Sequence, residues 1–200
     1  MPAPPSRVVA AIAVEALGAE HVHGVSMPSR YSSDGSKDDA LALAQNLNIP
    51  YQSVPIEPAF AAYLSMLEEG FAGKAEDLTE ENLQSRVRGM ILMALSNKHA
   101  WMVLTTGNKS EMAVGYSTLY GDMCGSLSVL GDVYKGQVYA LARYINRNEV
   151  IIPQEIIEKA QKRFREKIDA TLIPELQTEN WKERTKLPLG MDENGILFFD

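Results

Sequence analysis

The chain has 200 residues, of which 46% are hydrophobic and 22% charged, and its formal net charge is -7. This balance is typical of a globular protein with a substantial core, and the acidic charge argues against a protein that coats nucleic acid. The single cysteine, Cys124, excludes an intramolecular disulfide and a cysteine-based metal site, and it favours the reducing cytoplasm. No run reaches the roughly 20 apolar residues that span a membrane. The apolar run after Arg7 is too short for a secretory signal, and Glu15 interrupts it.

The first half of the chain alternates predicted helices and strands. The proline-rich residues 1–6 predict no regular element, and Gly18 is placed to end the helix that follows. Helices are predicted at residues 7–18, 37–48, 57–71 and 80–98, and short apolar strands at 22–27, 51–56 and 101–106. This order favours an α/β fold with a parallel sheet.

The second half is more interrupted. Residues 108–115 open a further helix or turn, and a glycine-bearing stretch separates them from a helix at 134–146 with Asp132 as its expected N-cap. From Val150 onward the pattern is helical to about residue 176, and a turn and a short terminal strand follow. The basic residues at 162–167 are interpreted as a solvated helix face.

The stretch TTGNKSE, residues 105–111, supports two interpretations. Asn108 and Glu111 have the spacing of a capping box, which closes the first turn of a helix. The same segment follows a strand, where open α/β sheets bind ligands. There Thr106 can donate a hydroxyl to a phosphate, and Glu111 can coordinate Mg²⁺.

The long helix at 80–98 carries a polar face and an apolar stripe. Asn82, Arg86 and Gly89 share one face. They form either an exposed polar face with an incidental glycine or a gap that admits a flat group bearing a carboxylate. The stripe consists of Leu83, Val87, Met90, Ile91, Ala94 and Leu95.

Other polar residues give weaker signals. Asp122 alone is typical of a turn, and Lys135 alone is typical of a solvated first-turn side chain. His21, His23 and His99 have no metal-site or triad spacing.

Three stretches together resemble a known family. GVSMPSRYSSDGSKDDA, EENLQSRVRGMILMALSNK and LTTGNKSEMAVGYSTLYGDM, in this order, are similar to the synthetase domain of NAD⁺ synthetases, most of all the glutamine-dependent form. The similarity runs from about Val8 to about Pro153. It implies an adenine nucleotide α-hydrolase-like fold, a parallel sheet flanked by helices, in a homodimer. It also implies adenylation of deamido-NAD⁺ by ATP with Mg²⁺, followed by displacement of AMP by ammonia.

The resemblance also implies roles for individual residues. Thr106 matches an ATP contact, and Lys135 matches a residue that neutralises phosphate. Glu111 matches an acidic residue associated with Mg²⁺ and deamido-NAD⁺, and Asp122 matches an acidic position in a mobile loop. Asn82 and Arg86 match contacts to deamido-NAD⁺, the latter near the nicotinate carboxylate.

Two departures from the family limit these expectations. The family's glycine-rich SGGxDS loop is replaced here by MPAPPS, in which only Ser6 matches, and the sequence after Pro153 is unfamiliar. We therefore expect a synthetase-like domain at 1–153, a divergent tail at 154–200, and slow turnover. No glutaminase domain is recognisable, so the expected nitrogen donor is ammonia or a glutaminase domain outside this chain.

Two alternatives remain open. The chain could be a catalytically impaired nucleotide-binding or dimerisation module of the same fold. It could also be another ATP-dependent amidating enzyme, of the GMP-synthetase kind, although the Asn82–Arg86 helix and TTGNKSE argue against that.

Overall fold

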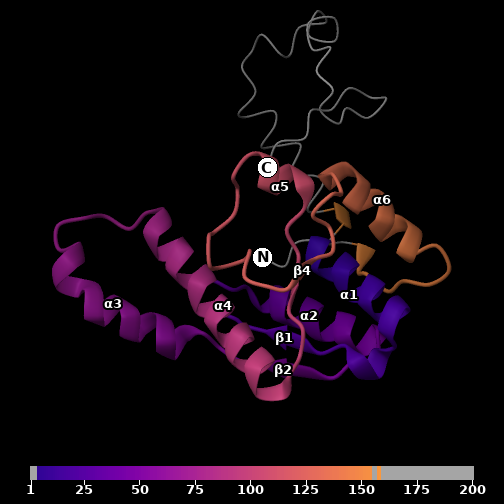
Figure 1. The fold of residues 1–200 in the computed structure, drawn as a ribbon, viewed down its shortest axis with the longest axis horizontal. Coiled ribbons are helices and arrows are strands. Elements are labelled where there is room, and N and C mark those ends of the chain that lie inside the picture. Colours follow the sequence, from indigo (N-terminus) through magenta and orange to yellow (C-terminus); the bar gives the residue numbers. More distant parts are fainter. Residues whose placement is uncertain (1–3, 155–156, 159–200) are drawn as a thin grey trace, which may run out of the picture.

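The computed structural model describes residues 4–154 and 157–158 (Figure 1). Its first elements are α1 (Pro4–Leu17), a 3₁₀ turn η1 (Ala19–His21), β1 (Gly24–Ser26), α2 (Asp34–Asn46), β2 (Tyr51–Ser53) and α3 (Glu57–Phe71). They are followed by α4 (Leu78–His99), β3 (Leu104–Thr105), α5 (Lys109–Ala113), β4 (Leu127–Ser128) and α6 (Lys135–Ile145). The predicted tail helix and terminal strand lie outside the described residues.

Helix boundaries follow local chemistry. Helix α1 begins at Pro4, so the expectation of an irregular segment through residue 6 was wrong, because a helix tolerates proline in its first turn. Gly18 follows the last helical residue with φ of 90°, as its placement predicted. Helix α3 has the predicted bounds, and α4 starts two residues earlier, where Asp77 and Glu80 form a capping box.

The start of α6 corrects one prediction. Tyr134, and not Asp132, is the N-cap residue, and its backbone N–H donates to the Gln137 side chain. The Asp132 carboxylate instead accepts a 2.6 Å bond from the Lys109 ammonium.

The strands form two separate parallel pairs. Gly24, Val25 and Ser26 of β1 pair with residues 51–53 of β2, and β3 pairs with β4. The α/β class and the parallel direction are confirmed, but the strands are shorter than predicted. Pro55 has no N–H to extend the β2 ladder. Strand β4 has only two residues, too few to give a periodic signal.

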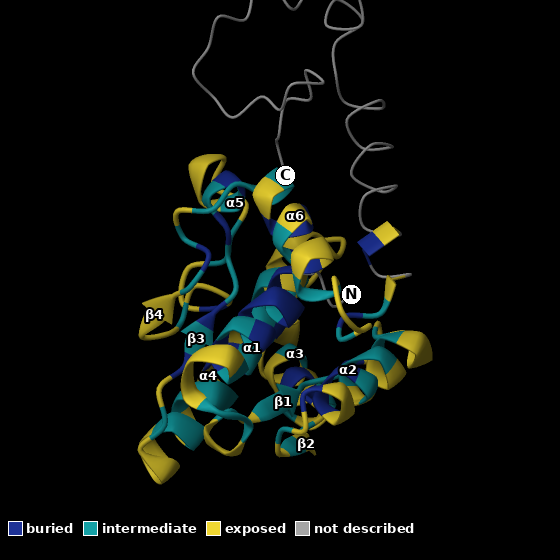
Figure 2. Cartoon of the chain, turned by 90° about the vertical axis from the view of Figure 1, so that its right-hand side faces the viewer, coloured by how far each residue is buried: buried dark blue, intermediate teal, exposed yellow. Residues whose placement is uncertain are grey.

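The main core lies between α1 and α6 (Figure 2). Its buried side chains include Val8, Leu43, Leu130, Val138, Ala142, Ile152 and Ile157. On the other side, α3 and α4 project as a pair away from this core (Figure 1). In the part of the chain that the structure describes, no helix is long and apolar enough to cross a membrane.

Candidate functional site

The segment after β3 is held by the predicted capping box. The Asn108 Oδ1 atom accepts from the Glu111 backbone N–H (3.1 Å), and Glu111 Oε2 accepts from the Asn108 N–H (3.0 Å). Asn108 is fully buried. The capping interpretation is therefore confirmed, and it fixes the backbone and one carboxylate oxygen of Glu111.

The other Glu111 oxygen faces Lys135. Their charged atoms lie 3.7 Å apart, and the side chains are only 16% and 12% exposed. The two residues meet because the Lys135 backbone N–H donates to Ser110 Oγ, which joins α5 to the start of α6. Lys135 is thus not the solvated first-turn side chain that its position alone suggested.

Asn82 and Arg86 bind a loop between α5 and β4. The Thr118 hydroxyl donates to Asn82 Oδ1 (2.8 Å), and Arg86 Nε donates to the Leu119 carbonyl (3.2 Å). Asp122 closes the loop on itself, because its carboxylate accepts from the Thr118 N–H at 2.6 Å. The polar face of α4 is therefore a docking surface for residues 118–122, which include a predicted site residue.

Gly89 has a structural role in this docking. A Cβ at Gly89 would lie 3.0 Å from the Tyr120 carbonyl oxygen and 3.1 Å from that of Gly121. The interpretation of Gly89 as incidental was therefore wrong, because a side chain there would meet the loop backbone. Gly89 also lines the larger of the two cavities described next.

Two cavities adjoin at Asp122. The smaller, of about 90 Å³, is lined by Glu111, Asp122, Thr105 and Gly107 among others. The larger, of about 660 Å³, is lined by Thr106 and Asp122 and extends along β1, α1 and α4. This volume is typical of small-molecule sites. The structure thus places Thr106, Glu111 and Asp122 around adjoining spaces, whereas Lys135 contacts this group through Glu111.

Two arginines of the larger cavity were not singled out by the sequence. Arg7 is 1% exposed, and burial lowers its pKa to about 10. The negative charge of Asp39, 3.8 Å away, raises the pKa and offsets part of this shift. Arg88 donates from Nε to the Met27 carbonyl, and burial also lowers its pKa. A positive residue within the apolar run of α1 was the available signal for Arg7. Both guanidinium groups can pair with a phosphate or carboxylate.

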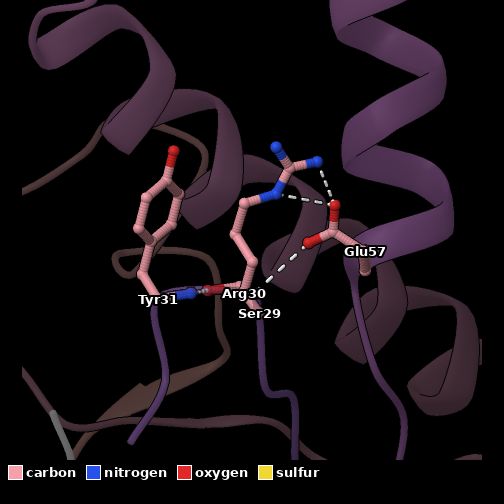
Figure 3. Close-up of polar contacts among 4 residues, drawn as sticks. All are labelled: Ser29, Arg30, Tyr31 and Glu57. Atoms are coloured by element: carbon pink, nitrogen blue, oxygen red, sulfur yellow. Dashed lines mark hydrogen bonds and ion pairs between the residues drawn. The ribbon is translucent and has the colours of Figure 1, made fainter.

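The segment after β1 is tied to the start of α3 (Figure 3). Arg30 donates from Nε to Glu57 Oε1 (2.8 Å) and from its backbone N–H to Oε2 (3.2 Å). The hydrogen bonds to Glu57 raise the pKa of Arg30 and lower the pKa of the Glu57 carboxyl. This clamp ties the loop that follows β1 to the first turn of α3.

Comparison with known proteins identifies relatives of this arrangement. The family described as NAD synthase matches residues 5–172. The glutamine-dependent NAD(+) synthetase of Thermotoga maritima is 56% identical over 156 residues, which are 77% of this chain and 27% of that protein. The same enzyme of Synechocystis is 55% identical over 154 residues, with 77% and 28% covered. The chain therefore spans less than a third of the length of these curated relatives.

Two solved structures with a similar fold are also NAD synthetases. The glutamine-dependent NAD⁺ synthetase of Acinetobacter baumannii in complex with ADP has a TM-score of 0.76 and 45% identity, over 78% of this chain and 30% of that one. The NH3-dependent NAD synthetase of Campylobacter jejuni, in complex with the nitrate ion, has a TM-score of 0.69 and 27% identity, over 95% and 86%.

Proposed function

Because the chain belongs to the NAD synthase family, whose members are ligases, we propose that it amidates deamido-NAD⁺ to NAD⁺ with ATP and ammonia. A carboxylate oxygen of deamido-NAD⁺ attacks the α-phosphorus of ATP, and pyrophosphate leaves. Ammonia then attacks the acyl carbon, and AMP leaves with the transferred oxygen. The observation that carries this proposal is the pair of cavities that share Asp122, one with Thr106 and one with Glu111.

The proposed roles follow from the contacts. Thr106 donates its hydroxyl to ATP, and Arg88 and Lys135 supply positive charge as pyrophosphate separates. Arg86 attracts the nicotinate carboxylate and, with Asn82, holds the loop that carries Asp122. Glu111 orients Lys135 through their ion pair.

The carboxylates of the smaller cavity fit Mg²⁺. Mg²⁺ commonly uses one or two carboxylates and completes its shell with water and phosphate oxygens. Glu111 and Asp122 line the same small cavity and would hold the ion, Glu111 through the oxygen that faces Lys135. The bound ion would neutralise ATP phosphate oxygens. The described residues include no cluster of three or more histidine, cysteine, aspartate or glutamate side chains that could hold a metal ion.

The proposal extends to partners and location. ATP use is supported by the ADP bound to the Acinetobacter relative. Ammonia is supported by the Campylobacter relative, which is described as NH3-dependent. We also propose a cytoplasmic homodimer, and a glutaminase domain as nitrogen source where one accompanies this chain.

A direct assay tests the function. The 200-residue chain is incubated with deamido-NAD⁺, ATP, Mg²⁺ and ammonium chloride, and AMP and NAD⁺ are followed. Both products should appear in equal amounts, and omission of ammonium should abolish NAD⁺. Turnover is expected to be well below about 1 s⁻¹, because Pro4, Pro5 and Ser6 form the first turn of α1 and supply no glycine-rich loop. The absence of NAD⁺ above the rate without protein contradicts the proposal.

A further inference from the structure

Ser85 lies on the face of α4 that binds the loop at 118–122, three residues after Asn82. Residues at this spacing are neighbours on a helix surface. The Ser85 Oγ atom accepts a 3.0 Å hydrogen bond from the Asp122 backbone N–H. Asn82 Oδ1 accepts a 2.8 Å bond from the Thr118 hydroxyl. Two neighbouring side chains of α4 therefore hold the two ends of the same loop.

The loop backbone approaches Ser85 closely. A Cβ at Gly121 would lie 2.3 Å from Ser85 Oγ and 2.9 Å from Ser85 Cβ, which is nearer than real Cβ atoms come to their neighbours. A larger residue at position 121 would therefore displace either the loop or the Ser85 side chain. One turn further along α4, a Cβ at Gly89 would lie 3.1 Å from the Gly121 carbonyl oxygen. The two glycines, one on the helix and one in the loop, thus allow the loop backbone to reach the Ser85 hydroxyl.

Asp122 is fixed through both its backbone and its side chain. Its N–H donates to Ser85, and its carboxylate accepts a 2.6 Å bond from the Thr118 N–H. Asp122 lines both cavities, and Ser85 lines the larger one. The hydrogen bond to Ser85 therefore sets where the aspartate lies at the junction of the two cavities.

We propose that Ser85 is a positioning residue, which holds Asp122 where the reaction needs its carboxylate. The proposal rests on the proposed function, in which Asp122 helps to hold Mg²⁺. Mg²⁺ demands a nearly ideal octahedral arrangement of its ligands, and a misplacement of about 1 Å in an active site can lower the rate about 100-fold. Ser85 acts through the backbone of Asp122, so its loss should change the position of the carboxylate and not its chemistry.

Amide exchange tests the contact without any substrate. The exchange rate of the Asp122 N–H is measured by NMR in the ligand-free, ¹⁵N-labelled chain. Ser85→Ala removes the acceptor, so this rate should rise roughly three- to tenfold, as expected for the loss of one neutral hydrogen bond. Ser65→Ala, at an exposed position of α3, should leave the rate unchanged. An unchanged rate in Ser85→Ala would overturn the proposal.

Kinetics distinguish positioning from a general loss of stability. In the ammonia-dependent assay, Ser85→Ala should lower kcat about tenfold and change the KM for deamido-NAD⁺ less than about twofold. In a chain that already carries Asp122→Asn, Ser85→Ala should have almost no further effect on kcat, because Ser85 acts only through the Asp122 carboxylate. Equal losses of kcat in both backgrounds would overturn the proposal.

The two measurements separate this proposal from the function on which it rests. The absence of NAD⁺ from the unmodified chain overturns the proposed function, and with it the purpose of the positioning, whereas the exchange rate still decides the contact. Faster exchange of the Asp122 N–H with an unchanged kcat would show that Ser85 holds the loop without serving the reaction, and this outcome overturns the positioning role alone.

Discussion

The Glu111 carboxylate interacts with two neighbouring residues, Asn108 and Lys135. One carboxylate oxygen closes the capping box with Asn108, and the other faces the Lys135 ammonium at 3.7 Å. Both side chains are mostly shielded from solvent, so their interaction is screened less than that of a surface pair. The same residue therefore caps the start of α5 and holds the Lys135 ammonium close to it.

Arg86 should determine the preference for deamido-NAD⁺ over NAD⁺. A guanidinium pairs with the acid but gains little from the amide, and a charge-assisted hydrogen bond contributes about 1.5–3 kcal/mol. Calorimetry should therefore show about 10- to 150-fold tighter binding of deamido-NAD⁺. Arg86→Met should remove the preference, whereas the exposed Arg143→Met on α6 should keep it. Equal affinity of the unmodified chain for both dinucleotides would exclude this role.

The ion pair between Arg30 and Glu57 should make the stability of the fold depend on pH. The folded-state pKa of Glu57 is lowered by Arg30, so its contribution is complete above the unfolded-state pKa and is lost as pH falls through the folded-state pKa. Glu57→Gln should therefore lower Tm near neutral pH, and the difference from the unmodified chain should shrink below about pH 4. Glu68→Gln, an exposed change on the same helix, serves as the control. A constant difference between pH 7 and pH 3 would contradict the account.

At the scale of elements, the end of β3 and the whole of α5 depend on one buried amide. Asn108→Ala removes the acceptor for the Glu111 N–H and leaves that donor without its cap. Loss of such a cap typically costs about 1–2 kcal/mol of unfolding free energy, which urea denaturation measures. Asn97→Ala, at an exposed position within α4, should cost less than about 0.5 kcal/mol. If the two variants are equally stable, the capping box does not stabilise the fold.

The helices were largely predictable from the sequence, and the strands less so. Periodic apolar positions gave the bounds of α3 and nearly those of α4, because many residues contribute to a helical pattern. Strands of two or three residues carry too few positions for such a pattern, so β4 was missed and β3 was predicted too long. Asp132 was wrongly predicted as the N-cap of α6. An aspartate just before a helix can cap it or pair with a distant lysine, here Lys109, and the sequence does not distinguish the two.

Of the candidate site, the local capping pattern was predictable from the sequence, and the long-range contacts were not. The TTGNKSE capping spacing is local, so it could be found. The docking of the loop at 118–122 on Asn82, Arg86 and Gly89 depends on residues more than thirty positions apart. Arg7 and Arg88 reach the larger cavity only through the packing of α1 and α4.

At the scale of the molecule, α4 is a candidate dimer surface. Only part of the predicted apolar stripe of α4 is buried. Val87 lies in the interior, whereas Met90 is 67% exposed. The α3–α4 pair, which projects from the core (Figure 1), therefore presents exposed apolar side chains such as Met66 and Met90. Sedimentation should show a dimer at high micromolar concentration, and Met90→Glu should shift it toward monomer. Val150→Glu, at an equally exposed position, should not. A monomer at every concentration would contradict this surface.

The proposed function depends on one chemical step, in which a carboxylate becomes a mixed anhydride with AMP before ammonia attacks it. An isotope experiment follows that step itself. Deamido-NAD⁺ labelled with ¹⁸O in its nicotinate carboxylate is turned over with ATP, Mg²⁺ and ammonium, and the AMP is examined by mass spectrometry. The account predicts that one labelled oxygen passes to each AMP as NAD⁺ forms, at a rate that falls at least 100-fold in Glu111→Gln. AMP without the label, or label transfer unchanged in Glu111→Gln, would contradict it.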